Sequence, residues 1–126
     1  MALMANVKLS TQRPIVNHPH YENEGIRSRT LEVYTVYSRK PIDEVYEKLK
    51  SLGVDYYILQ ASSCTNGHPK PNCTYVQMWD LIDAENRQRE SACSIILRSL
   101  RSGDKSLIQP MHIAYNSGGD YLVLKL

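Results

Sequence analysis

The sequence contains no phenylalanine, although nine tyrosines and one tryptophan are present among its 126 residues. Most of its large aromatic side chains therefore carry a hydroxyl group, which needs a hydrogen-bond partner or water when the ring is buried. Two interpretations follow from this composition. Either the tyrosines lie at the boundary of the core, where half-buried phenols are common, or part of a tyrosine-rich surface faces a partner or a wet cleft.

The chain also lacks a marked excess of one charge and a long hydrophobic run. Fifteen Lys and Arg residues stand against thirteen Asp and Glu residues, which gives a net charge of +2. The basic residues are scattered and form no stripe with aromatics, so nothing indicates nucleic-acid binding. No apolar run approaches the roughly 18–20 residues that span a bilayer, and the first residues do not form a signal peptide. We therefore expect the chain, taken alone, to be soluble.

Several signatures of catalysis and cofactor binding are absent as well. The sequence has no glycine-rich phosphate loop, no Gly-x-Ser-x-Gly motif and no recognisable spacing of Ser, His and Asp, so we predict no catalytic residue and no cofactor. Metal-ligating residue types are present, but structural zinc sites normally repeat a closely spaced ligand pair, and that spacing is missing. We therefore expect no metal site from the following residues: His18, His20, His68, Cys64 and Cys73.

The segment around Trp79 holds the one tryptophan and two nearby acids, Asp80 and Asp83. The two acids could be interpreted as a carboxylate pair. We favour the alternative, in which Trp79 anchors a small part of the core and the acids start the next helix, where they complement its dipole.

Hydrophobic periodicity predicts strands and helices in the first half of the chain. Alternating apolar positions predict one or two short strands within residues 4–16. A stripe at helical spacing predicts a helix over residues 23–37. Pro41 suits the first turn of a second helix, which Gly53 caps at its end. Residues 54–59 are then predicted to form a buried strand.

The second half contains a loop, a helix and a hairpin. Residues 64–74 lack periodicity and are rich in Asn, Gly and Pro, which predicts an irregular loop. A helix is predicted over residues 91–100, with its start nearer Asp83. Residues 111–115 and 121–126 are predicted to form a hairpin around a Gly-Gly turn. The predicted fold class is therefore α/β, with a single mixed sheet flanked by about three helices and a C-terminal β-hairpin.

The segment from Arg13 to Tyr21 is the strongest candidate for a binding site. Its two prolines fix their own φ angles and push the preceding residues towards extended geometry, so the run presents polar side chains from a stiff backbone. An ordinary loop with solvated histidines is the alternative interpretation. The candidate substrate-binding residues are Arg13, Asn17, His18, His20 and Tyr21.

Three cysteines leave their oxidation state open. Cys64 and Cys73 could form a disulfide in an oxidising compartment, with Cys93 left over, and a bond between Cys73 and Cys93 is the other pairing considered. In a reducing compartment all three stay inert thiols. Asn72 begins an Asn-Cys-Thr acceptor sequence for N-glycosylation, although an early bridge at Cys73 would hinder the modification.

Several segments, in their order and spacing, resemble one family. The chain reads Met-Ala-Asn-Val-Lys-Leu-Ser-Thr before the candidate binding segment, then Val-Tyr-Thr-Val-Tyr-Ser-Arg-Lys, and then Val-Asp-Tyr-Tyr-Ile-Leu ahead of Cys64, Cys73 and Trp79. Together these segments resemble the C-terminal, lumenal part of the dumpy-nineteen-like protein C-mannosyltransferases. The resemblance implies that residues 1–126 form a single lumenal C-terminal domain of a GT-C type glycosyltransferase. The chain is then expected to be a fragment from which the transmembrane catalytic domain is missing.

Enzymes of this family transfer mannose from dolichyl-phosphate mannose to carbon C2 of a tryptophan in Trp-x-x-Trp type segments of nascent secretory proteins. The resemblance therefore implies an endoplasmic reticulum membrane enzyme, with this domain on the lumenal side. Its partners would be the lipid-linked sugar and the acceptor polypeptide. The carboxylate expected to take the central role belongs to an early lumenal loop that this chain does not contain. We therefore expect the fragment to be inactive alone.

The resemblance also suggests roles for the candidate residues. Arg13 is expected to pair with a phosphate, whose oxygens match a guanidinium, while Asn17 and the histidines hold peptide backbone or sugar hydroxyls. Lumenal placement favours a Cys64–Cys73 disulfide over free thiols. Two other interpretations stay open. One is a non-catalytic binding or regulatory paralogue that uses its tyrosine-rich surface, and the other is a small cytosolic α/β protein related by descent alone.

Overall fold

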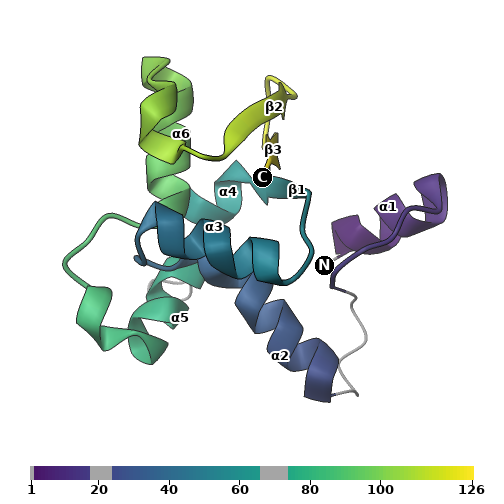
Figure 1. The fold of residues 1–126 in the computed structure, drawn as a ribbon, viewed down its shortest axis with the longest axis horizontal. Helices are drawn as coiled ribbons and strands as arrows, with labels where there is room; N and C mark the ends of the chain where they lie inside the picture. Colours follow the sequence, from purple (N-terminus) through teal and green to yellow (C-terminus); the bar gives the residue numbers. More distant parts are fainter. Residues whose placement is uncertain (1, 18–23, 66–73) are drawn as a thin grey trace.

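The chain forms an α/β fold in which helices pack on one three-stranded sheet, as a computed structural model shows (Figure 1). The structure describes residues 2–17, 24–65 and 74–126. The predicted α/β class with a C-terminal hairpin is confirmed, and the described residues hold more helices than the three expected. In chain order the elements are α1 (Ala2–Thr11), α2 (Glu24–Val33), the 3-10 helix η1 (Tyr34–Tyr37), α3 (Ile42–Ser51), β1 (Tyr56–Gln60), α4 (Ala61–Thr65), α5 (Tyr75–Ile82), η2 (Ala84–Asn86), α6 (Ala92–Ser102), η3 (Lys105–Ile108), β2 (His112–Asn116) and β3 (Tyr121–Lys125).

The sheet has the order β1–β3–β2, so the strand that comes last in the sequence lies at its centre. β3 pairs with both neighbours in antiparallel orientation, and Lys125 lies opposite Tyr56 on one side and His112 on the other. We expected a mixed sheet, but every strand pair in the described residues is antiparallel. The hairpin reverses the chain between β2 and β3, and β3 also runs against β1, so no parallel crossover is needed.

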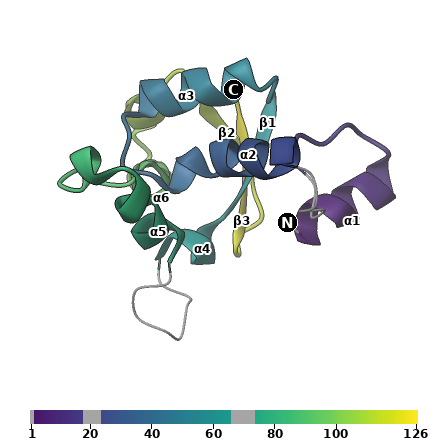
Figure 2. The same ribbon diagram turned by 90° about the horizontal axis from the view of Figure 1, so that it is seen from below.

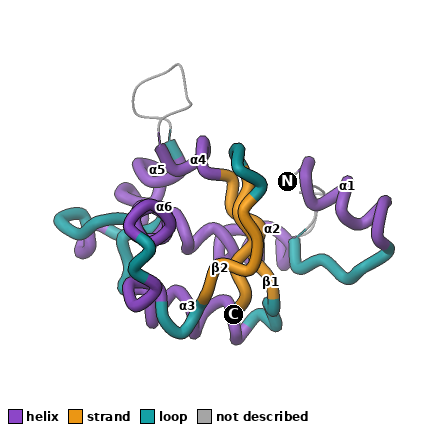
Figure 3. Tube along the Cα trace, turned by 90° about the horizontal axis from the view of Figure 1, so that it is seen from above, coloured by secondary structure: helices purple, strands orange, loops and turns teal. Residues whose placement is uncertain are grey.

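One face of the sheet covers the core. On β1 and β3 every second side chain is buried, which is the pattern of a sheet packed on one side. α3, α5 and α6 lie on one side of the sheet, whereas α1 stands apart on the other side (Figure 2, Figure 3). The fully or nearly fully buried core includes Val45, Leu49, Leu59, Ile96, Leu122 and Leu124.

The predicted helices over residues 23–37 and after Pro41 are confirmed as α2 with η1 and as α3. Pro41 is the N-cap residue of α3, immediately before its first turn. Gly53 follows α3 with a φ of +76°, a backbone conformation that strains residues with a Cβ atom. This conformation lets the Val54 N–H donate to the Leu49 carbonyl at 3.1 Å and ends the helix.

The predicted strand at residues 54–59 and the predicted hairpin are also confirmed, as β1 and as β2 with β3. In the hairpin connection Gly118 has a φ of +75°. The Asp120 carboxylate accepts hydrogen bonds from the Ser62 N–H (2.6 Å), the Ser62 hydroxyl (2.7 Å) and the Gln60 amide (2.8 Å). Asp120 therefore links the hairpin to the end of β1 through these hydrogen bonds. The hydrogen bonds from Ser62 and Gln60 also hold the pKa of this carboxyl below its usual value.

Replacing Asp120 by alanine is expected to lower the free energy of unfolding by about 1 kcal/mol at neutral pH, since hydrogen bonds to a partly exposed carboxylate are lost. Because the folded-state pKa is depressed, this stabilisation is present above the unfolded-state pKa of about 3.9 and is lost as the pH falls through the folded-state value. Urea unfolding of both proteins at neutral pH and near pH 2 measures the difference. A difference of the same size at both pH values would contradict the assignment.

The predicted strands within residues 4–16 are wrong. Residues 2–11 form α1 instead, and residues 12–17 form no regular element. The apolar positions in this segment alternated only loosely, and Ala, Leu, Met and Lys all favour a helix. Leu9 is 75% exposed, so α1 does not turn a complete apolar face towards the core.

Two helices lie where the sequence analysis placed a loop and the lead-in to a helix. α4 takes up the first residues of the predicted 64–74 loop, and α5 precedes the predicted 91–100 helix. α6 begins at Ala92 with Ser91 as its N-cap, and not near Asp83. α5 begins with a capping box, in which the Thr74 hydroxyl accepts from the Gln77 N–H (3.2 Å). The Thr-x-x-Gln spacing before an apolar run is the signal that the sequence analysis missed.

Candidate functional site

Two of the five predicted substrate-binding residues lie in the described part of the chain. Arg13 is exposed, and its backbone N–H donates to the Thr11 hydroxyl at 3.2 Å, just beyond α1. Asn17 is only 6% exposed, beside Val16, which packs against the core. The structure therefore places the guanidinium in solvent and the amide inside. The remaining three lie outside the described residues: His18, His20 and Tyr21.

An open groove of about 380 Å³ lies between α2 and α5. Its volume falls within the range of roughly 300–1,000 Å³ that small-molecule and side-chain sites occupy. The lining is mostly aromatic and aliphatic, and sequence reasoning pointed to it only through the general excess of tyrosine. The lining residues are Arg27, Thr30, Leu31, Tyr34, Tyr75, Met78, Trp79 and Ile82.

Three tyrosines, two from η1 and one from α5, form an aromatic cluster, and two of them, Tyr34 and Tyr75, line this groove. Tyr34 and Tyr75 lie with ring centroids 5.1 Å apart, and Tyr37 stacks on Tyr75 at 5.0 Å with an angle of 30° between the rings. The Tyr34 and Tyr37 rings meet edge to face at 5.8 Å. Such contacts add stability beyond the area they bury, so the cluster joins η1 to the first turn of α5.

The buried phenols of this region keep their protons at neutral pH. Burial raises the pKa of Tyr37 to about 12, partly offset by a hydrogen bond with Ser63. Burial also raises the pKa of Tyr57, which lies among the same tyrosines. These hydroxyls can therefore donate or accept a hydrogen bond, but they are unsuited to removing a proton from a substrate.

Thr30 is the one polar groove residue that is almost completely buried, at 4% exposure. Within the described part of the chain, its hydroxyl is the buried side-chain group that lacks a hydrogen-bond partner. An unpaired hydroxyl in an apolar setting costs about 1–3 kcal/mol relative to a paired one. The groove thus contains a polar group whose hydrogen-bonding capacity is unused.

The other wall of the groove is anchored by an ion pair on the reverse side of α5. Arg39 donates from Nε to Asp80 Oδ1 at 2.8 Å and from a terminal nitrogen to Asp80 Oδ2 at 3.3 Å. Lys40 lies 3.7 Å from an Asp83 oxygen. Both carboxylates are therefore engaged by cations, which argues against a catalytic pair. Trp79 is 9% exposed and belongs to the main core, and Asp80 lies within α5 instead of starting a new helix.

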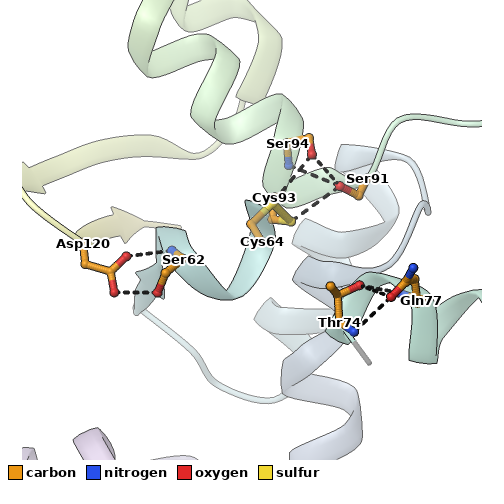
Figure 4. The surroundings of a disulfide bond; sticks show 8 residues. All are labelled: Ser62, Cys64, Thr74, Gln77, Ser91, Cys93, Ser94 and Asp120. Carbon is orange, nitrogen blue, oxygen red and sulfur yellow. Dashed lines mark hydrogen bonds between the residues drawn. A yellow bond between two sulfur atoms is a disulfide. The ribbon is translucent and has the colours of Figure 1, made fainter. Parts of the chain in front are cut away.

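A disulfide joins Cys64 of α4 to Cys93 in the first turn of α6, with an S–S distance of 2.11 Å (Figure 4). The predicted Cys64–Cys73 pairing is therefore wrong, and Cys93 is not the unpaired residue. The short helix α4 carries Cys64 onto the N-terminal end of α6, where Cys93 is fully buried. The hydroxyls of Ser91 and Ser94 lie beside the two sulfurs, at 3.5 Å and 3.6 Å.

A second, more polar cavity of about 260 Å³ lies next to this disulfide. Thr74 and Gln77 lie on one side of it and Ser91 and Ser94 on the other (Figure 4). Its polar groups already bond to one another, since Ser91 donates to Ser94 at 2.8 Å. This cavity therefore offers fewer unsatisfied groups than the groove between α2 and α5.

The described residues contain no group of three or more His, Cys, Asp or Glu side chains that could hold a metal ion. The predictions for three other residues fall outside the described part of the chain: His68, Asn72 and Cys73. Within the described ranges, no helix has both the length and the apolar character needed to cross a membrane.

An aromatic and aliphatic groove, with one unpaired hydroxyl and one arginine, is suited to binding an apolar or aromatic group of a peptide or of another segment. It holds no arrangement of nucleophile and base.

Comparison with known proteins gives the wider context. The family model described as "Dpy19: Q-cell neuroblast polarisation" matches residues 1–126. C-mannosyltransferase dpy-19 of Caenorhabditis briggsae is 49% identical over 126 residues, which are 100% of this chain and 18% of that protein. C-mannosyltransferase dpy-19 of Caenorhabditis elegans is 48% identical over the same share. Protein C-mannosyl-transferase DPY19L1 of Homo sapiens is 47% identical over 98 residues, or 78% of this chain and 14% of that protein.

The chain thus spans less than a fifth of the length of the relatives that it matches. The matched region nevertheless covers the whole chain, residues 1–126. On this evidence the chain belongs to the Dpy19 family.

Proposed function

We propose that residues 1–126 form the lumenal C-terminal domain of a protein C-mannosyltransferase. The whole enzyme would transfer mannose from dolichyl-phosphate mannose to tryptophan in Trp-x-x-Trp type segments. The observation that carries the proposal is the 49% identity, over the entire chain, to a relative named C-mannosyltransferase. The transmembrane catalytic part would be contributed by the polypeptide outside these residues.

The disulfide supports placement of this domain on the lumenal side of the endoplasmic reticulum membrane. Disulfides such as Cys64–Cys93 form and persist in oxidising compartments and are rare in the cytosol. The same bond weighs against the alternative of a small cytosolic protein, for which free thiols are expected.

This domain would shape the substrate side of the active site and would not supply its reactive carboxylate. Two partly buried carboxylates in the described residues already have partners within the fold. Asp80 binds Arg39, and Asp120 binds Ser62 and Gln60. The isolated chain is therefore expected to leave tryptophan peptides unmodified when it is given dolichyl-phosphate mannose.

Within this proposal the segment from Arg13 to Tyr21 contributes to substrate binding. The exposed Arg13 guanidinium is free to approach a phosphate, which it can bind through two parallel hydrogen bonds. The buried Asn17 would hold the backbone of the segment in the conformation that presents its neighbours. The histidines that follow would bind sugar hydroxyls or peptide backbone.

Arg13→Ala in the longer enzyme is expected to lower mannosyl transfer to a Trp-x-x-Trp reporter about tenfold, which corresponds to the loss of one charge-assisted contact worth about 1.4 kcal/mol. The reporter is quantified by mass spectrometry in cells that lack the endogenous enzyme. Arg101→Ala, which removes another exposed arginine, at the end of α6, is the matched control and should retain full transfer.

Equal transfer by both variants would remove the segment from the substrate site. Complete absence of transfer by the unmodified longer enzyme would overturn the proposed function itself. In that event the tyrosine cluster and the apolar groove favour the second candidate, a non-catalytic paralogue that binds partners through this surface. Capture of acceptor peptides without their modification would identify that candidate.

A further inference from the structure

The helix α5 is apolar on nearly every side. Six of its eight residues are apolar, and they point in different directions around the helix. Val76 and Trp79 are buried in the core, at 8% and 9% exposure. Met78, Leu81 and Ile82 are 53%, 80% and 60% exposed, so the opposite side of the helix presents large apolar side chains to solvent. A helix that is hydrophobic all round is normally buried all round.

The two polar residues of α5 do not provide a water-facing side either. Gln77 is used in the capping box with Thr74, where its side-chain oxygen accepts from the Thr74 N–H at 3.1 Å. Asp80 is used in the ion pair with Arg39. Both polar groups therefore serve contacts within the fold, and α5 retains no polar face for solvent.

The exposed side of α5 continues across the groove onto α2. Leu31, on the facing wall, is 44% exposed, and together with Met78 and Ile82 it gives the groove an apolar rim. Thr30 lies in the same wall, with its unpaired and nearly inaccessible hydroxyl. An exposed apolar surface and an unused buried hydroxyl thus occur in one place. If another element packs there, it can bury the exposed apolar side chains and supply a hydrogen-bond partner for the hydroxyl.

We propose that a helix from the part of the polypeptide outside residues 1–126 packs into the groove between α2 and α5. Two helices that enclose an open groove receive a third helix readily, because the side chains of the incoming helix fill the groove as ridges. The lining requires an apolar face on that helix, with a hydrogen-bonding group opposite Thr30. Most of the length of the matched relatives lies outside the aligned residues, so a polypeptide of similar length would have ample chain to supply the helix.

This inference rests on the proposal that the chain is part of a longer enzyme, but it does not depend on which group that enzyme transfers. A photo-activatable phenylalanine derivative at position 81 of the longer polypeptide, in place of Leu81, tests it directly. The expected product is an intramolecular cross-link to a peptide outside residues 1–126. The same derivative in place of Tyr115, which is 61% exposed on β2, controls for non-specific reaction and should give no product above background.

A cross-link from position 81 to a second copy, to a lipid or to a separate protein would overturn the inference, and so would the absence of any product. Mannosyl transfer is measured in parallel on the unmodified longer polypeptide. Absence of transfer there, with the cross-link formed from position 81, would count against the proposed function. Transfer without any cross-link from position 81 would count against the packed helix. The two proposals can therefore fail separately.

Thr30→Val provides a second test, because its expected effect on Tm has opposite signs in the 126-residue chain and in the longer polypeptide. In the 126-residue chain, removal of an unpaired buried hydroxyl at nearly constant volume is expected to raise Tm by roughly 3–5 °C. In the longer polypeptide, where the packed helix pairs with that hydroxyl, the same substitution is expected to lower Tm by a similar amount. Thermal unfolding followed by circular dichroism measures both. An increase in both settings would contradict the packed helix.

Discussion

Replacing Cys93 by alanine is expected to lower the free energy of unfolding of the 126-residue chain by about 3–4 kcal/mol, because the disulfide constrains the unfolded chain over a separation of 29 residues. Cys93 is fully buried in the first turn of α6, so the lost sulfur also leaves a small void. Urea unfolding of the oxidised protein and the variant measures the difference. Reduction of the unmodified protein should reproduce most of it.

Cys73→Ala is the matched control for this experiment. If Cys64 is bonded to Cys93, the control changes the free energy of unfolding by less than about 0.5 kcal/mol. Under a Cys64–Cys73 pairing, the control would instead lose the disulfide. Peptide mapping without reduction supplies the covalent evidence, since the fragment that contains Cys64 should be found linked to the fragment that contains Cys93. Recovery of a Cys64–Cys73 fragment would contradict the structure.

Leu124→Ala is expected to destabilise the chain by about 3–5 kcal/mol, which is the cost of removing a fully buried leucine from a core that cannot close the cavity. Leu124 is completely buried on the central strand β3 and belongs to the core that α3 and α6 cover. Small domains have a total stability of about 5–15 kcal/mol, so this one substitution removes a large fraction of it. Chemical denaturation of the 126-residue chain measures the change.

Leu81→Ala makes the same chemical change at a leucine that is 80% exposed on α5. In the 126-residue chain this variant should shift the free energy of unfolding by no more than about 0.5 kcal/mol. Comparable losses in the two variants would show that Leu81 is buried in this chain, contrary to the structure. No loss in Leu124→Ala would place β3 outside the core.

The elements that the sequence predicted correctly are those whose ends carry local signals. Pro41 and the acidic residues behind it mark the start of α3, and Gly53 marks its end, so both limits follow from the chemistry of a few neighbouring residues. The hairpin is similar, because Gly118 supplies the positive φ that its turn requires. Such signals do not depend on what the rest of the chain does.

The elements that were missed depend on contacts far along the chain, or on a weak pattern. α1 has no strong apolar face, so its sequence does not distinguish a helix from a strand. The disulfide depends on α4 bringing Cys64 to α6, and spacing cannot reveal such a contact. The direction of β3 was likewise decided by packing on β1, which local reasoning does not reach.

The candidate site likewise has features that the sequence indicated and features that only the folded structure reveals. The binding segment from Arg13 to Tyr21 was predicted from its prolines and polar side chains and stays a prediction, while the excess of tyrosine indicated a surface of interest. The position of that surface was not recognisable, because Tyr34 and Tyr75 come together only when η1 packs on α5. The unpaired hydroxyl of Thr30 is a property of its surroundings and has no signature in the sequence.

The central place of β3 bears on how this polypeptide is made. Among the described residues, β1 pairs only with residues 121–125, so the sheet cannot assemble until that segment has emerged from the ribosome. Until then, the buried residues of α3 and α6 lack the packing that Leu122 and Leu124 supply, and apolar surface left exposed in this way favours aggregation of the nascent chain. A premature stop codon anywhere before Tyr121 would leave β1 unpaired, and we expect the product to be cleared by quality-control degradation.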